Sequence, residues 1–351
     1  MSLLKTFKLV DTRYENTMIL VTGGTGYIGS HTCIALIEAG HEVIVVDNLT
    51  NSSIDSIARM ERITGNTISF VEGDIRDEAF LRDIFTRFKI TEVIHFAGVK
   101  AVGESIIDPL KYYDNNVTGT LSLLKVMDSS GCKNLIFSSS ATVYGWPSNV
   151  PVKEDSPLSA ANPYGQSKLF IEKILNNLYE SDRHWNIVVL RYFNPAGAHE
   201  SGLIGEAPNN IPNNLFPLVS QVAAGQRDSI KVFGGDYLTQ DGTGVRDYIH
   251  VTDLANGHVN ALSVLSDSVR ILTINLGTGV GYSVLEIIKA FEKVSCHQIL
   301  YSIVDRRPGD AAVCYADATY AKEMMGWSAK LTLAKMCEDQ WRWQKNMHIN
   351  L

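Results

Sequence analysis

The sequence predicts an α/β protein with a Rossmann-type doubly wound parallel sheet and a smaller C-terminal α/β region that binds substrate. Three observations lead to this prediction. Short apolar runs alternate with helical patterns through the first half of the chain, as in folds that wind helices over a parallel sheet. Most of these runs are apolar at consecutive positions, which is typical of strands buried on both faces. A glycine-rich loop follows the first run directly and opens a helix.

Six strands are expected before residue 194. Their runs are 18–22, 42–46, 68–71, 92–96, 134–138 and 187–191. A helical pattern over 30–39 separates the first two runs, and Gly40 provides its C-terminal stop. Residues 18–193 are therefore predicted to form a nucleotide-binding Rossmann domain.

After Asn194 the composition changes. The chain as far as Thr243 is rich in glycine, proline and asparagine, and a helix is expected there only around 215–224. Regular patterns return at 251–265, 272–275 and 283–294. We expect residues 194–351 to form mainly a substrate-binding domain over the carboxyl edge of the sheet, with some segments returning to the Rossmann domain.

Residues 1–17 precede the first strand. They carry Lys5, Lys8 and Arg13 and only a short apolar stretch, which is too weak for a secretory signal. A poorly ordered N-terminal extension is predicted.

Charge and cysteine content restrict the class of protein. The 351 residues carry a formal net charge of −7, which argues against nucleic acid or an anionic membrane as the main partner. No apolar run reaches about eighteen residues, so no transmembrane helix is expected. The five cysteines are scattered and form no C-x-x-C pair. We therefore expect reduced thiols in a cytoplasmic protein with no zinc site and no disulfides.

The glycine-rich loop has the features of a dinucleotide site. Gly23, Gly26 and Gly29 let backbone N–H groups approach a pyrophosphate at a helix N-terminus. Asp47 follows at the end of the second run, where a carboxylate accepts hydrogen bonds from a ribose diol and repels a 2′-phosphate. Together these features favour NAD over NADP. A tight turn that binds no ligand is the alternative.

A second motif indicates proton transfer. Ser140 lies at the end of the fifth run, and Tyr164 and Lys168 share one helix face at i, i+4 spacing. A lysine cation and a nicotinamide charge could together lower a phenol pKa from about 10 toward neutrality, a change of about 4 kcal/mol. Such a set suits removal of an alcohol proton while hydride leaves for NAD. The alternative is a surface tyrosine packed on a lysine stem.

Longer stretches place these motifs in a family. They are 21–31 (VTGGTGYIGSH), 46–49 (VDNL), 95–100 (HFAGVK), 137–145 (FSSSATVYG), 162–165 (NPYG), 190–195 (LRYFNP) and 241–251 (DGTGVRDYIHV). With them the chain resembles the extended short-chain dehydrogenase/reductase family and, within it, the UDP-glucose (UDP-galactose) 4-epimerases. The resemblance runs from Met18 to about Gln344.

The resemblance implies roles for particular residues. The family's catalytic positions fall on Ser140, Tyr164 and Lys168. Its NAD contacts fall on these three and on Gly23, Gly26, Tyr27, Ile28, Gly29, Asp47, Asn48, Asn51, Ser52, Asp74, Ile75, Phe96, Ala97, Gly98, Lys100, Asn115 and Phe193. Its UDP-sugar contacts fall on Lys100, Ser140, Tyr164, Asn194, Asn214, Leu215, Phe233, Arg246, Arg307, Asp310 and Cys314.

The chemistry of the residue types agrees with these roles. Arg246 and Arg307 suit bidentate pairing with a diphosphate, and Phe233 could stack on uracil. An ordinary surface ion pair is the alternative for each arginine. The resemblance further implies a homodimer, a tightly held NAD that is regenerated in each turnover, and a 4-keto sugar that rotates between oxidation and re-reduction.

Cys314 bears on the substrate range. Members of the family that carry a tyrosine at this position are restricted to UDP-glucose and UDP-galactose, whereas a smaller residue is associated with N-acetylated sugars as well. The sequence thus predicts activity on UDP-GlcNAc and UDP-GalNAc too. The alternative is that Cys314 is a small buried hydrophobe and Tyr315 closes the pocket.

Two other functions fit the fold. A nucleotide-sugar 4,6-dehydratase usually carries a Thr-Asp-Glu run where this chain has Ser140, Ala141 and Thr142, so the missing carboxylates argue against elimination. A non-catalytic NAD-binding sensor would be expected to lose the tyrosine–lysine pair, which this chain keeps.

Overall fold

The computed structural model describes residues 17–209, 212, 214–267, 270–307 and 309–347. The expected N-terminal extension, apart from Thr17, lies outside the described residues.

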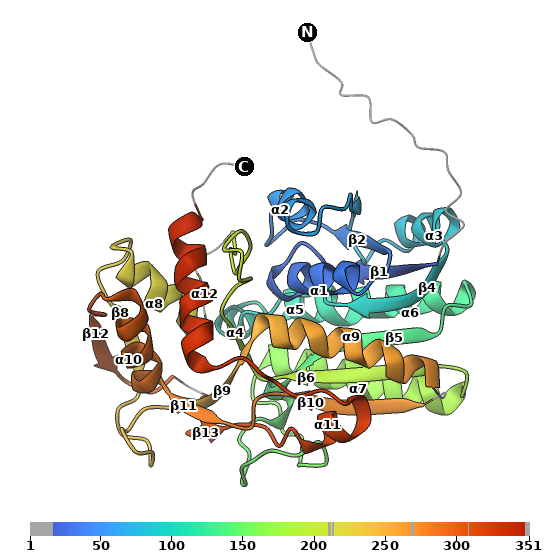
Figure 1. Cartoon of the computed structure of the whole chain (residues 1–351). Coiled ribbons are helices and arrows are strands. Elements are labelled where there is room, and N and C mark those ends of the chain that lie inside the picture. Colours follow the sequence, from blue (N-terminus) through green and yellow to red (C-terminus); the bar gives the residue numbers. More distant parts are fainter. Residues whose placement is uncertain (1–16, 210–211, 213, 268–269, 308, 348–351) are drawn as a thin grey trace.

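The core of the molecule is a parallel sheet of seven strands in the order β10-β6-β5-β4-β1-β2-β3 (Figure 1). The strands are β1 (Met18–Thr22), β2 (Val43–Asp47), β3 (Ser69–Glu72), β4 (Ile90–His95), β5 (Asn134–Ser140), β6 (Asn186–Tyr192) and β10 (Ile271–Leu276). The predicted Rossmann-type fold class is confirmed, and each predicted run lies within two residues of an observed strand.

Helices cover both faces of the sheet, and every residue of β1, β2 and β6 is buried between them. Ile19 and Val21 point to one face, where α1 (Tyr27–Glu38), α2 (Asp55–Thr64), α9 (Val251–Asp267) and α11 (Thr319–Met325) pack. Met18 and Leu20 point to the other, where α3 (Glu78–Arg87), α6 (Gly119–Ser129) and α7 (Pro163–Ser181) pack. The alternation along β1 therefore sorts the helices into two layers. None of the helices among the described residues has the length and apolar character needed to cross a membrane.

The second half of the chain contributes to both regions. Strand β10 and helices α9 and α11 complete the large sheet and its cover. The remainder forms a smaller region beside the carboxyl edge (Figure 1). In it β9 (Val245–His250) pairs with β7 (Asn194–Ala196), β11 (Gly281–Ser283) and β13 (Val313–Cys314), and β8 (Ile230–Phe233) pairs with β12 (Tyr301–Val304).

Three helices give this smaller region its own core. Their apolar faces meet around buried Phe216, Phe291 and Met336. The helices are α8 (Leu215–Ala223), α10 (Val284–Ser295) and α12 (Leu333–Asn346). The predicted helix around 215–224 corresponds to α8. The regular pattern expected at 283–294 corresponds to α10, which begins at a capping box formed by Ser283 and Glu286.

Short helical elements lie between β4 and α6 and after β5. They are α4 (Val102–Ile107), α5 (Pro109–Tyr112), the π-helical turn η1 (Tyr113–Thr118) and the 3₁₀ turn η2 (Ala141–Tyr144). The π-helical turn contains Asn115, and such turns are frequent near functional sites.

A buried ion pair ties α7 to the sheet. Arg191 on β6 forms two hydrogen bonds with Glu172 on α7, of 3.0 Å from Nε to Oε1 and 2.7 Å from Nη2 to Oε2. Ser139 also donates to Glu172, and Arg191 donates to the Tyr144 hydroxyl over 2.9 Å. Both ionic side chains are about 5% exposed or less, so each depends on the other for its stabilisation.

Replacing Glu172 with alanine is expected to lower the free energy of unfolding by about 3–5 kcal/mol, because it leaves the Arg191 charge buried without its counterion. Chemical denaturation measures this loss. The matched control is Glu180→Ala on the same helix, where an exposed pair with Arg183 contributes less than about 0.5 kcal/mol. Equal losses for both variants would contradict this account of the pair.

Candidate active site

The glycine-rich loop is shaped for close backbone approach. Gly23 has φ +73°, and a Cβ there would lie 2.6 Å from the Ala97 nitrogen. A Cβ at Gly29 would lie 2.3 Å from the Gly23 oxygen, so α1 sits directly against the loop. At Gly26, the N-cap of α1, a Cβ would meet only the Gly23 oxygen, at 3.3 Å. The loop therefore packs tightly against Ala97 and against α1, whereas the N-terminus of α1 at Gly26 is unobstructed. An anion can bind there.

Asp47 ends β2 beside this loop. Its carboxylate accepts hydrogen bonds from the Thr25 nitrogen (3.2 Å), the Leu49 nitrogen (2.9 Å) and the Ser52 hydroxyl (3.1 Å). Two residues past the end of β3, the Asp74 carboxylate accepts from Asn48 over 3.1 Å. Hydrogen bonds from Arg76 lower the pKa of Asp74 to about 2, so it is ionised. Two acidic groups thus flank the loop on the side of β2 and β3.

The other residues predicted to contact NAD follow successive strands at the same edge. Phe96, Ala97 and Gly98 follow β4, Ser140 ends β5 and Phe193 follows β6. The Phe96 and Ala97 nitrogens both donate to the Thr22 oxygen, at 2.9 and 3.0 Å, which joins the ends of β4 and β1. The strand order reverses between β4 and β1, and ligands of doubly wound sheets bind at such a reversal.

Tyr27 connects the loop to the smaller region. Its hydroxyl donates to the Gly197 oxygen over 2.6 Å, and burial raises its pKa well above the ordinary value. Its side chain is therefore fixed away from the loop, and its backbone in the first turn of α1 is the part that can meet a cofactor.

Ser140, Tyr164 and Lys168 are brought together at the carboxyl end of β5. Asn162 caps α7 by accepting from the Gly165 nitrogen over 2.9 Å, and Pro163 starts the helix, so Tyr164 lies in its first turn. The Ser140 hydroxyl accepts a hydrogen bond from the Thr142 nitrogen over 3.3 Å and is close enough to Tyr164 to act on its pKa. Lys168 lies one turn further on and is 5% exposed.

The Lys168 ammonium forms its hydrogen bond with the backbone of β5 and not with Tyr164. Its Nζ donates to the Ser138 oxygen over 2.7 Å, and burial lowers its pKa to about 8. Burial raises the pKa of Tyr164, and the Ser140 hydroxyl offsets part of that rise. The Lys168 ammonium is thus hydrogen-bonded to a backbone carbonyl, and the expectation that its charge and that of a nicotinamide together lower the phenol pKa stays a prediction.

The residues predicted to hold the nucleotide sugar gather around β9 and β13. The Arg307 guanidinium lies 4.2 Å from the centre of the Phe233 ring, so one face of this ring is covered. Arg246 lies 3.9 Å from the Asp310 carboxylate and is the register partner of Cys314. Asn214 caps α8, Leu215 begins it, and Asn194 begins β7.

The Cys314 side chain lies on the face of β13 that packs against a neighbouring apolar cluster, called the inner face below. It packs against a cluster that includes Phe193 and Ala141, and burial raises the pKa of its thiol to about 11. Tyr315 lies on the opposite face, since a Cβ at Gly281 would be 3.2 Å from its ring. The Tyr315 ring therefore does not close the space beside Cys314.

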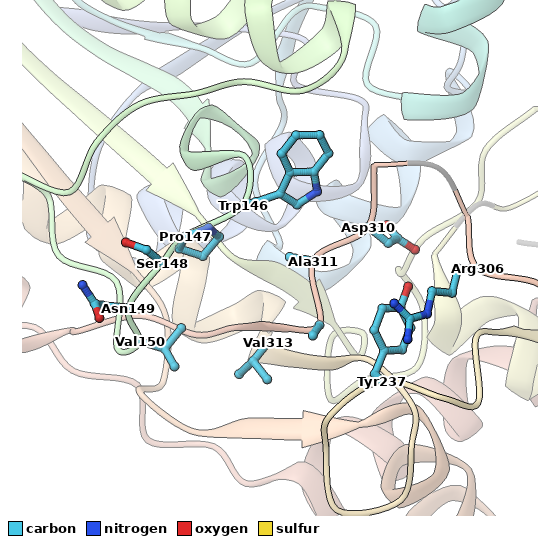
Figure 2. Close-up of a pocket in the computed structure, with 11 residues that line it drawn as sticks. Trp146, Pro147, Ser148, Asn149, Val150, Tyr237, Arg306, Asp310, Ala311 and Val313 are labelled. Atoms are coloured by element: carbon cyan, nitrogen blue, oxygen red, sulfur yellow. The ribbon is translucent and has the colours of Figure 1, made fainter.

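A pocket of about 340 Å³ opens beside this group (Figure 2). The loop at 146–150 and the segment at 310–313 line it together with Tyr237 and Arg306, which lie on the other side of the 310–313 segment from that loop (Figure 2). The Trp146 indole donates to the Gly309 oxygen over 3.1 Å and so joins the two segments. Asp310 is the predicted substrate residue that lines this pocket; the sequence had not singled out Trp146, Tyr237 or Arg306.

The fold and the side chains at the strand ends define a Rossmann-type protein of the short-chain dehydrogenase/reductase class. A family model described as GDP-mannose 4,6 dehydratase matches residues 20–340. UDP-glucose 4-epimerase from Bacillus subtilis is 56% identical over 328 residues, which cover 93% of this chain and 97% of the relative. The chain belongs to the UDP-glucose 4-epimerase family of the extended short-chain dehydrogenases/reductases.

Solved structures agree with this assignment. UDP-glucose 4-epimerase from Bifidobacterium longum, in complex with NAD+ and UDP, superposes with a TM-score of 0.92 at 53% identity, covering 94% of this chain and 98% of that one. The UDP-Glc/GlcNAc 4-epimerase from Campylobacter jejuni superposes with a TM-score of 0.82 at 37% identity, covering 94% and 100%.

Proposed function

We propose that this protein is an NAD-dependent UDP-hexose 4-epimerase that interconverts UDP-glucose and UDP-galactose. The observation that carries the proposal is the placement of Ser140 at the end of β5 and of Tyr164 and Lys168 at the start of α7, on the same edge of the sheet as the glycine-rich loop. Family membership supports it, because the Bacillus subtilis relative is a UDP-glucose 4-epimerase.

The residues present fit NAD. The open N-terminus of α1 at Gly26 suits a pyrophosphate, and Asp47 suits a ribose diol. Asn48, Asp74 and Phe96 would line the remainder of the site at the ends of β2, β3 and β4. NAD, when bound, supplies the acceptor and then the donor of hydride at C4 of the sugar.

The chain's own groups handle the proton and the nucleotide. Tyr164 takes the proton of the 4-hydroxyl as C4 is oxidised and returns it as C4 is reduced, with the Ser140 hydroxyl nearby. Because Lys168 is held by the Ser138 oxygen, its charge acts on Tyr164 through space and not by direct contact. Arg246 and Arg307 hold the diphosphate, so the sugar can present both faces to the same tyrosine.

We further infer that the substrate range includes UDP-GlcNAc and UDP-GalNAc. A small thiol at Cys314, on the face of β13 shared with Arg246, leaves room that a tyrosine would fill, and Tyr315 packs on the other face. The Campylobacter jejuni neighbour is a UDP-Glc/GlcNAc 4-epimerase.

A homodimer is also part of the proposal. Large apolar side chains on α4 and α5 face solvent, with Ile107 86% and Leu110 78% exposed. Phe170 on α7 is 44% exposed and stacks on Tyr113. Exposed apolar surface of this kind is typical of a protein–protein contact.

Incubation of the purified protein with UDP-galactose, without added NAD, tests the proposed activity. The expected product is UDP-glucose, because the cofactor is retained and regenerated. Formation of a dehydrated sugar would instead indicate a 4,6-dehydratase, a function opposed by the absence of a carboxylate at 140–142. No product, even with added NAD, would indicate a non-catalytic NAD-binding protein.

A further inference from the structure

A buried carboxylate joins two of the segments assigned to ligand binding. Glu206 lies in the loop before α8 and its side chain is 6% exposed. Its Oε1 accepts from Lys100 Nζ over 2.8 Å, and the Asn214 amide nitrogen lies 2.8 and 2.9 Å from its two oxygens. Lys100 follows β4 in the Rossmann domain, whereas Asn214 is the N-cap of α8 in the smaller region. Glu206 therefore connects the two sides of the site.

The loop that carries Glu206 is fixed independently of its carboxylate. The Trp343 indole donates to the Glu206 backbone oxygen over 3.4 Å. Gly205 lies flat on the same indole, since a Cβ there would be 2.5 Å from Trp343 Cδ1. The backbone at this position is thus held by α12, and the carboxylate is free to serve a purpose other than anchoring the loop.

Glu206 determines which way the Asn214 amide faces. A carboxylate only accepts hydrogen bonds, so the amide nitrogen must point to it, and both N–H bonds are then used. The side chain of Asn214 makes no capping hydrogen bond to the described first turn of α8, although asparagine is a favoured N-cap. Pro217 has no N–H, so the first turn of α8 offers the N–H groups of Leu215 and Phe216 to another acceptor, and an anion is the acceptor that a helix N-terminus favours.

The negative charge of Glu206 also holds the Lys100 ammonium in place. Its Nζ is drawn to Glu206 and lies 5.9 Å from the centre of the Tyr27 ring, beside the start of α1. The Lys100 side chain is 45% exposed, so one side of the ammonium remains available to a ligand. A glutamine at 206 would remove the charge to which both Lys100 and Asn214 donate, and would hold both less firmly.

We propose that Glu206 is a positioning residue for the nucleotide diphosphate of the substrate: it turns Asn214 away from its own helix and holds Lys100 at the opposite side of the site. This inference rests on the proposed function, because it takes a nucleoside diphosphate as the ligand. Glu206 itself touches neither the reacting carbon nor its proton.

The test is calorimetric titration of UDP into the purified holoenzyme and its Glu206→Gln variant. The dissociation constant for UDP is expected to rise about tenfold, since two charge-assisted hydrogen bonds are lost. In turnover, KM for UDP-galactose rises by a similar factor while kcat stays within about threefold, because the proton-transfer groups are unchanged. Glu200→Gln, on an exposed position of the same loop, is the matched control and leaves both constants unchanged.

A double variant separates positioning from general stability. If Glu206 acts through Asn214 and Lys100, then Asn214→Ala and Lys100→Met should each weaken the effect of Glu206→Gln on UDP binding. Additive effects, or a UDP affinity in Glu206→Gln within twofold of wild type, would overturn the inference. Should the glutamine variant fail to fold, Glu206→Asp replaces it: an intermediate loss of affinity supports the inference, and wild-type affinity overturns it. If the wild-type protein itself does not bind UDP, the proposed function fails together with this inference.

Discussion

The Tyr164→Phe variant is expected to turn over UDP-galactose about 10³-fold more slowly than wild type, with KM within about threefold. The phenylalanine ring keeps the packing of the first turn of α7 but removes the hydroxyl that takes the proton of the 4-hydroxyl. A loss of 10³-fold in kcat corresponds to about 4 kcal/mol of transition-state stabilisation. Stopped or coupled assays of UDP-glucose formation measure it.

The matched control for this variant is Tyr179→Phe, about four turns along the same helix, where the ring packs under Arg183. It should retain wild-type kcat. The wild-type rate should also rise with pH, because burial raises the pKa of Tyr164 and the phenolate is the form that accepts a proton. A Tyr164→Phe enzyme that keeps a tenth or more of the activity would remove Tyr164 from the role of proton acceptor.

The Cys314→Tyr variant is expected to lose UDP-GalNAc turnover by about 100-fold in kcat/KM, while UDP-galactose turnover changes by less than about threefold. The added ring would occupy the space beside Arg246 on the inner face of β13, and steric exclusion of an acetamido group accounts for the difference. Parallel assays of the two substrate pairs give the ratio directly.

Cys314→Ser is the control for this variant, because it changes the thiol but keeps the size of the side chain. Both activities should survive in it, since burial keeps the thiol protonated and without a chemical role. The size argument is wrong if Cys314→Tyr processes the acetylated and non-acetylated sugars in the wild-type ratio.

The strands of the large sheet could be predicted from sequence because each is buried on both faces. Val43 to Val46 are all buried, and a run of consecutive β-branched apolar residues is typical of a strand covered on both sides. The strands of the smaller region are two to six residues long, and their composition does not set them apart from loops. Their pairing with β9 depends on contacts between distant segments, which local patterns do not carry.

In the candidate site, too, residues whose places follow from local spacing could be predicted from the sequence, whereas contacts between distant segments could not. Gly26 and Asp47 stand in fixed relation to a strand and a helix, so spacing alone identifies them. Tyr164 and Lys168 share a helix face, but the direction of the lysine depends on the carbonyl of Ser138, which belongs to another element, β5. Glu206 could not be found from the sequence: it is one of five acidic residues in the stretch rich in glycine, proline and asparagine, and its partners lie at positions 100 and 214.

The central claim is that hydride leaves and returns to the same carbon on a cofactor that the protein retains. The most direct measurement uses UDP-galactose with deuterium at C4, converted in ordinary water without added NAD, and mass and NMR analysis of the product. The account predicts UDP-glucose that keeps the deuterium at C4. A product that carries hydrogen at C4, or one that has lost a molecule of water, would contradict it.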